Sequence, residues 1–113
     1  MTQDAFRRLA LCLPEAVEQE HMGHPDFRVG GRIFATLHGR DEINGMVKLT
    51  PAQQKAFVRE EPAVYAAIAG GWGRGGATLV KLRAAKASSV RHALAAAWRN
   101  TAPRRLVGKL DEE

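Results

Sequence analysis

The chain has 113 residues, a formal net charge of +5 and 45% hydrophobic residues. This length supports one hydrophobic core and excludes a catalytic domain joined to a regulatory one, so we expect a single domain over residues 1–113. The lone Cys12 excludes an intramolecular disulfide, and no segment reaches the roughly 20 apolar residues of a membrane span. We therefore expect a cytoplasmic monomer that needs no membrane.

Positive charge is concentrated in the C-terminal half of the chain. Residues 62–110 hold nine Lys or Arg and no Asp or Glu, whereas residues 1–61 hold eight basic and nine acidic side chains. A one-sided positive field attracts polyanions such as nucleic acid or anionic lipid head groups. The charge pattern therefore favours a polyanionic partner.

The N-terminal half predicts one helix followed by four short strands. Apolar residues recur at helical spacing over about residues 3–13, and Cys12 falls on the apolar side, where we expect it to be buried. From residue 17 to 49 the pattern alternates, with turn residues at 23–25, 30–31 and 39–42. The clearest hairpin has its turn at Gly30-Gly31, because glycine adopts the positive φ that two-residue turns need.

The C-terminal half predicts two more helices and more sheet. Thr50 and Gln53 form a capping box that starts a helix ending near residue 60, and a short strand or turn follows around 64–68. A strand is expected over 77–83, and a helix from about Ser88 until Pro103, after which the tail is expected to be loosely ordered. This order predicts an α+β fold of two layers, an antiparallel sheet with helices on one face.

The glycine run from Gly70 to Gly76 matches G-x-G-x-x-G but lacks the context of a nucleotide site. A dinucleotide-binding fingerprint needs a preceding strand, a following helix and an acidic residue about 20 positions on, whereas here a strand follows. The run instead predicts a supple hairpin tip that presents Trp72 and Arg74. Alternatively, the side chain of Trp72 folds back onto the sheet and is buried as a core plug, that is, as a part of the core, which the high average burial of Trp favours.

Basic side chains share one predicted face of the sheet. If Val47 and Val80 face the helices, alternation turns Lys48 and Lys81 to the open face. The same alternation places Phe34, Thr36 and His38 opposite Ile33, Ala35 and Leu37. Such a basic face could follow a phosphate backbone, although an ordinary solvated face is the alternative.

The histidines raise a metal hypothesis. His21 and His24 form H-x-x-H, and His38 could approach them across the sheet. A usable site needs three or four convergent ligands and no Cys pair accompanies the histidines, so we expect no metal and no cofactor.

Glu18 and Glu20 could act as paired catalytic carboxylates, but alternating acids on an early strand are more typical of a charged edge. We expect no catalytic residues.

The chain resembles the YjbR/MmcQ family over nearly its whole length. The resemblance rests on Leu-Pro-Glu after the first helix, Gly23–Ala35, Val-Lys-Leu-Thr-Pro, Gly71–Gly76 and the closing Trp98-Arg99 with Ala102-Pro103. It implies an α+β layout similar to type III secretion chaperones and frataxin, with a double wing proposed to bind DNA. The wings would be the hairpin around Gly30-Gly31 and the loop Gly70–Gly76. Relatives commonly carry a bulky residue where this chain has Ala77, which puts aromatic stacking at the second wing in doubt.

Together, the charge pattern and the resemblance predict a non-enzymatic domain that binds duplex DNA with low sequence specificity. The alternative is a protein-binding or chaperone-like module that holds another chain. A small-molecule site at the three histidines is a third possibility that would need a deep pocket. The predicted DNA-binding residues are Arg28, Arg32, Lys48, Trp72, Arg74, Lys81 and Arg83.

Overall fold

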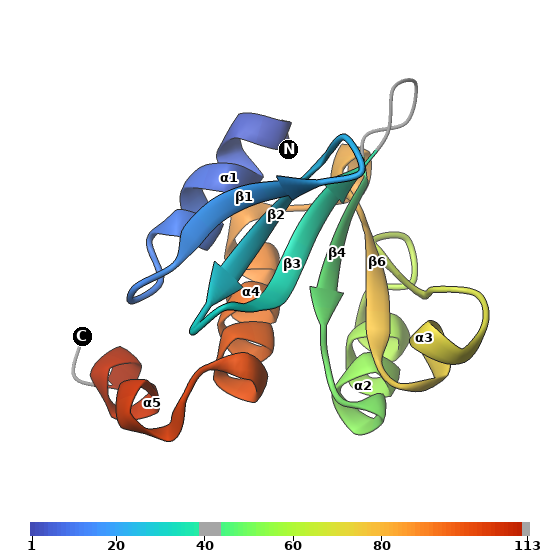
Figure 1. Ribbon diagram of the computed structural model, residues 1–113. Helices are drawn as coiled ribbons and strands as arrows, with labels where there is room; N and C mark the ends of the chain where they lie inside the picture. The colour runs from blue at the N-terminus through green and yellow to red at the C-terminus, as the bar shows by residue number, and fades with distance from the viewer. Residues whose placement is uncertain (39–43, 112–113) are drawn as a thin grey trace.

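The computed structural model describes residues 1–38 and 44–111, so the turn predicted at 39–42 lies outside the described residues. The elements are α1 (Gln3–Leu11), β1 (Val17–His21), β2 (His24–Val29), β3 (Arg32–His38), β4 (Asn44–Lys48), α2 (Pro51–Glu60), β5 (Tyr65–Ala67), α3 (Gly71–Arg74), β6 (Ala77–Lys81), the 3-10 helix η1 (Leu82–Ala84), α4 (Ala87–Thr101) and α5 (Arg104–Asp111) (Figure 1). They follow the predicted order of helix, strands, helix, strands and helix, with α3, η1 and α5 in addition.

The strands described form one antiparallel sheet in the order β1-β2-β3-β4-β6-β5. The predicted hairpin between β2 and β3 is confirmed, and its turn residues Gly30 and Gly31 have φ angles of 59° and 80°. These are left-handed conformations that favour glycine. A Cβ on Gly30 would also lie 2.8 Å from the ring of Pro103, so the tip of this hairpin packs against the segment between α4 and α5.

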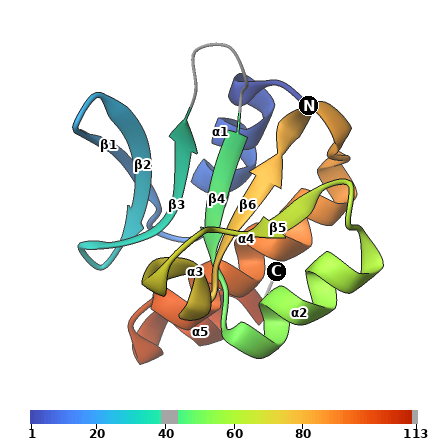
Figure 2. The same ribbon diagram turned by 90° about the vertical axis from the view of Figure 1, so that its right-hand side faces the viewer.

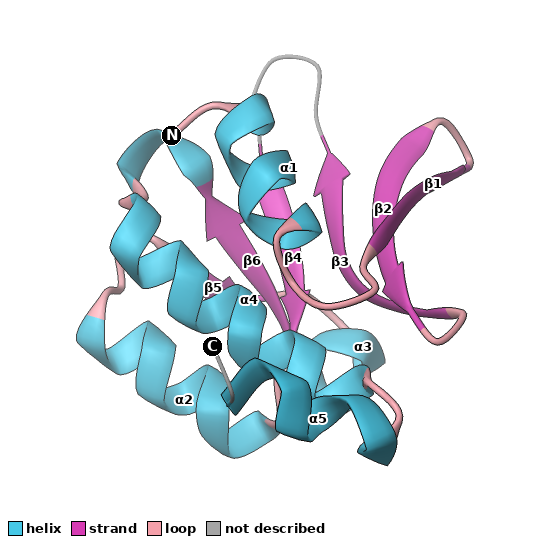
Figure 3. Cartoon of the chain, turned by 90° about the vertical axis from the view of Figure 1, so that its left-hand side faces the viewer, coloured by secondary structure: helices cyan, strands magenta, loops and turns pink. Residues whose placement is uncertain are grey.

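The core lies between the sheet and the helices α1 and α4, which cover one face (Figure 3). Phe6 of α1, Phe27 and Val47 of the sheet, and Leu94 and Trp98 of α4 are all buried there. The burial of Leu94 and Trp98 confirms the predicted apolar side of α4. Burial of this one face against helices confirms the predicted α+β class.

Strand β3 departs from the predicted alternation at Phe34. The register with β2 shifts between Phe27 and Arg28, so Ala35 lies opposite Phe27 while Ile33 lies opposite Arg28. Such a bulge reorients one side chain, and Phe34 is fully buried within the hydrophobic core. The expectation that Phe34 shares the open face with His38 is therefore wrong.

Two further expectations were also wrong. Residues 104–111 form the helix α5 rather than a loose tail, because Leu106 is fully buried in the core and gives this segment an anchor. Cys12 is exposed. Helix α1 ends at Leu11, and Cys12 is the C-cap that follows it, so this residue does not continue the apolar side of the helix.

The glycine run forms one turn of helix, α3, and not a supple hairpin tip. Ideal Cβ atoms would lie 1.4 Å from the Ile68 carbonyl oxygen at Gly73 and 1.9 Å from the Leu49 carbonyl oxygen at Gly76. Only glycine permits backbones to approach this closely. The buried side chain of Gln54 then donates to the carbonyls of Gly73, at 3.0 Å, and Ala77, at 2.9 Å. These contacts hold α3 firmly against its neighbours.

We predict that Gly73→Ala lowers the free energy of unfolding by about 1–3 kcal/mol or more, because the new methyl group overlaps backbone that cannot move away. Gly71→Ala is the matched control in the same helix, since the nearest atom to its Cβ is the flexible Arg74 guanidinium at 3.4 Å. That variant should be neutral or up to about 1 kcal/mol more stable. Urea denaturation measures both values, and equal stability of the two variants would contradict the close packing of α3.

Candidate functional site

A pocket of about 320 Å³ lies beside α3, at the end of the sheet where β4 finishes and β6 begins. Figure 2 shows α3 across this end of the sheet. Four segments distant in sequence meet here, from β3, β4, α3 and α4. The lining residues are Arg32, Lys48, Leu49, Gly71, Trp72, Gly75, Ala77, Asn100 and Thr101.

The charged side chains that line this pocket are cationic. Arg32 is exposed and Lys48 is half-buried, and no acidic side chain is among the described residues that line the pocket. Asn100 of α4 donates from Nδ2 to the Lys48 carbonyl, at 3.1 Å, and to Gln53 Oε1, at 2.7 Å. These bonds fix the end of β4 to α4 and α2. The pocket therefore combines positive charge with a backbone segment at Lys48 that is fixed by hydrogen bonds.

Trp72 is 48% exposed, so the expected core plug is wrong. The short helix α3 explains the difference, because the bare backbone of Gly73 faces inward and makes the close contact with Ile68. One position earlier on the same turn, Trp72 is left at the surface and lines the pocket. Trp98 is the tryptophan that fills the core, with no exposed surface.

A row of polar side chains crosses the opposite end of the open sheet face. His21 lies opposite His24, the rings of His24 and His38 have centroids 4.8 Å apart, and the row continues from His38 through Asn44 to Lys81. Because side chains alternate along strands, this row faces away from the buried core. The structure thus brings together the three histidines that the sequence singled out.

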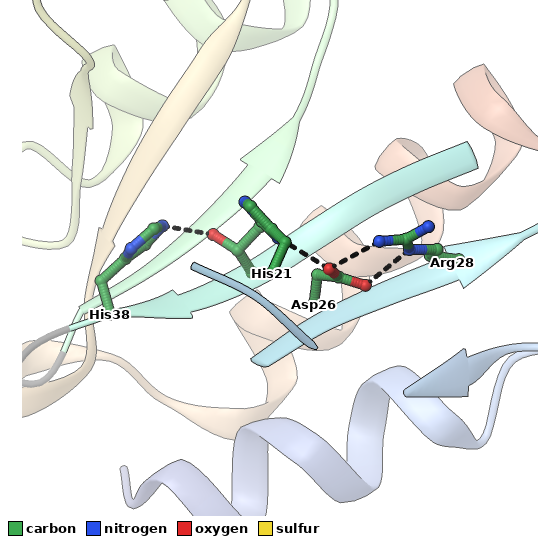
Figure 4. Close-up of polar contacts among 5 residues, drawn as sticks. His21, Asp26, Arg28 and His38 are labelled. Carbon is green, nitrogen blue, oxygen red and sulfur yellow. Dashed lines mark hydrogen bonds and ion pairs between the residues drawn. The ribbon is translucent and has the colours of Figure 1, made fainter. Parts of the chain in front are cut away.

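Asp26 organises the centre of this face (Figure 4). Its buried carboxylate accepts hydrogen bonds from Arg28, Nε at 2.8 Å and Nη2 at 3.0 Å, and lies 2.7 Å from Nδ1 of His21. The hydrogen bond from Arg28 lowers the pKa of Asp26, against the opposing effect of burial, and His21 lowers it further. Arg28 is therefore paired with an internal carboxylate, a partner that the sequence prediction missed. The sequence signal for this pair was its spacing, because residues two apart on a strand, such as Asp26 and Arg28, point to the same face.

The predicted DNA-binding residues separate into groups. Arg32, Lys48 and Trp72 line one pocket, with Arg74 exposed on the same helix turn as Trp72. Lys81 is at the other end of β6, roughly 13 Å away along the strand. Arg83, expected on a strand, is in η1 beyond the sheet. Arg28 lies between these ends, bound to Asp26.

The histidine row differs from a metal site. Among the residues that the structure describes, no group of three or more His, Cys, Asp and Glu is arranged to hold a metal ion. The ring of His38 lies 2.6 Å from the Thr36 hydroxyl. Burial lowers the pKa of His38, and the nearby His24 and His21 lower it further. Protonation of His38 is therefore less favourable than protonation of a free histidine side chain.

These features define a small α+β domain with a covered sheet face and an open one. A family model named YjbR matches residues 11–100, and the chain belongs to this family. A search of curated proteins finds no match. Among solved structures, the Deinococcus radiodurans protein DR2400, described as a DUF419 domain, is similar with a TM-score of 0.74 and 17% identity over 97% of this chain and 88% of that chain. At this identity the similarity shows the fold.

No helix in the described ranges is long and apolar enough to span a membrane.

We predict that Asp26→Asn lowers the free energy of unfolding by about 1.5–3 kcal/mol, because it weakens charge-assisted bonds at a buried carboxylate. Glu18→Gln is the control, since Glu18 bonds to Arg7 at 2.8 Å near the surface and such pairs contribute about 0–1 kcal/mol. Urea denaturation at neutral pH measures both. A loss no larger for Asp26→Asn than for Glu18→Gln would show that the Asp26 network does not stabilise the fold.

The lowered pKa of His38 also predicts a pH dependence. When pH falls below the ordinary value of 6.5, the unfolded chain binds a proton at His38 before the folded chain does, so stability falls. His38→Gln should therefore lose less stability than the parent between about pH 7.5 and about pH 5.5. His92→Gln, an exposed site on α4, is the control and should keep the parental slope. Denaturation at the two pH values tests this, and an unchanged slope in His38→Gln would contradict it.

Proposed function

We propose that the chain binds DNA through the open sheet face and the pocket beside α3, contacting phosphates with little discrimination between sequences. The observation that carries the proposal is the convergence of Arg32, Lys48 and Trp72 in one pocket without an acidic lining residue among those described. Cations supply affinity for phosphate, and an exposed aromatic ring supplies a surface on which a base can lie.

The charge of the surrounding face supports this assignment. Glu18 of β1 is turned to the helix side and is bound to Arg7 of α1. Asp26 is neutralised by Arg28. Lys48 and Lys81 therefore contribute positive charge to the open face without a described acidic partner. A phosphate backbone lying across the face would meet cations at both ends.

A protein-binding module is the second candidate. Strand β1 is at an edge of the sheet, and all of its residues are exposed. An edge strand offers unpaired backbone groups to which an extended peptide can add. The acidic side chains of β1, Glu18 and Glu20, discourage such pairing, and for this reason the DNA hypothesis is preferred.

The proposal predicts that Arg32→Glu with Lys81→Glu weakens DNA binding strongly. Each lost phosphate contact should reduce the slope of log affinity against log salt by about 1. Lys55→Glu with Arg91→Glu is the matched control, with the same change in net charge at exposed positions on α2 and α4. Fluorescence anisotropy of a labelled duplex at several salt concentrations measures the slopes.

The comparison of DNA affinity between the two double variants tests the proposal. Loss confined to Arg32→Glu with Lys81→Glu supports the pocket and the open face together as the DNA site. Equal loss in both pairs would mean that binding reflects net charge alone, since any basic protein attracts DNA at low salt. Absence of binding near physiological salt by the parent chain, both to this duplex and to its separated strands, would reject the proposal and favour a protein partner.

A further inference from the structure

We propose that the pocket beside α3 binds one unpaired nucleotide, its base stacked on Trp72 and its phosphates held by Arg32 and Lys48, so that the chain prefers single-stranded to double-stranded DNA. This inference rests on the proposed function and deepens it. It names the form of nucleic acid that the same site selects.

The indole of Trp72 is exposed on a rigid support. Its neighbour Gly73 packs against Ile68, and Gln54 bonds to the Gly73 and Ala77 carbonyls. Because the backbone beneath the ring is fixed, little conformational freedom is lost when a base stacks on it. An accessible ring held in this way is suited to stacking, which tolerates every base because each has a π face.

The cations come from different elements and line the same pocket as the ring. Arg32 begins β3, Lys48 ends β4 and Trp72 belongs to α3, and all three line the same pocket. Nucleic-acid sites that take single strands combine positive charge along the backbone with aromatic surfaces for the bases. The pocket has both parts within one small volume.

The size of the pocket favours a single nucleotide. Its volume of about 320 Å³ is near the lower limit for small-molecule sites, which span about 300–1,000 Å³. Bases inside a duplex are stacked on both sides, so a duplex offers the indole no free face without unstacking. A single strand offers its bases freely, and this difference generates the preference.

The other exposed apolar side chains argue against a broad protein-docking patch around Trp72. The large hydrophobic side chains that are exposed in the described part of the chain are Leu11, Val17, Met22 and Trp72. Of these, only Trp72 lines the pocket. The aromatic surface is therefore local and shares its pocket with two cations, as a nucleotide requires.

The test compares a short labelled single strand of mixed sequence with its duplex, by fluorescence anisotropy near physiological salt. Trp72→Ala should weaken single-strand binding about 5- to 150-fold, the range expected for one stacked base, and change duplex binding far less. Trp72→Phe should retain most of the affinity, because it keeps an aromatic ring. Met22→Ala, which removes an exposed side chain outside the pocket, should have no effect. Emission from Trp72 should be quenched by the strand, whereas buried Trp98 gives a constant background.

The outcomes separate this inference from the proposed function. If Trp72→Ala affects both DNA forms equally or neither, the stacking site is rejected, while the proposed function stands as long as Arg32→Glu with Lys81→Glu still weakens binding. If neither form of DNA binds the parent chain, both proposals fail. Thymidine monophosphate that binds as tightly as the strand would assign the pocket to a free nucleotide and overturn the preference for single strands.

Discussion

The packing of α4 on β3 and β4 joins the longest helix described to the centre of the sheet. Trp98 of α4 is fully buried in the core, and its indole donates to the Pro14 carbonyl at 3.0 Å, which also holds the chain beyond α1. Burial of one sheet face leaves the other face to the polar side chains, among which Met46 and Leu79 also lie. The histidine row and the Asp26 network therefore lie on the side away from α4, whereas the pocket at the end of the sheet is lined in part by Asn100 and Thr101 of α4.

The pocket is connected to this core through backbone contacts and through Leu49, which lines the pocket and belongs to the core. Gly76 packs against Leu49, which follows β4, and Gln54 of α2 holds the carbonyls on either side of it. Asn100 of α4 binds the Lys48 carbonyl from the other side. As a result Trp72 is positioned by the same elements that form the core, although its own ring is outside it.

The distribution of charge in space differs from its distribution along the chain. Arg105 and Lys109 belong to the basic C-terminal half, yet they lie 3.4 Å and 3.6 Å from Glu15, which follows α1. Arg28 is likewise paired with Asp26. Only part of the positive charge counted from the sequence is therefore available to a partner at the open face, and the position of each cation matters more than the net charge.

The sequence by itself determined the fold class and most of the elements, because these depend on local signals, but it did not determine α3 and α5. The capping box at Thr50 and Gln53, the Gly30-Gly31 turn and the apolar spacing that includes Trp98 act within a few residues of one another. Which side chains meet was decided by the tertiary structure alone. The pocket joins residues from 32 to 101, and the helical form of the glycine run depends on contacts with Ile68, Leu49 and Gln54. Periodicity assigns a residue to a face, whereas only the packing of distant segments determines its neighbours.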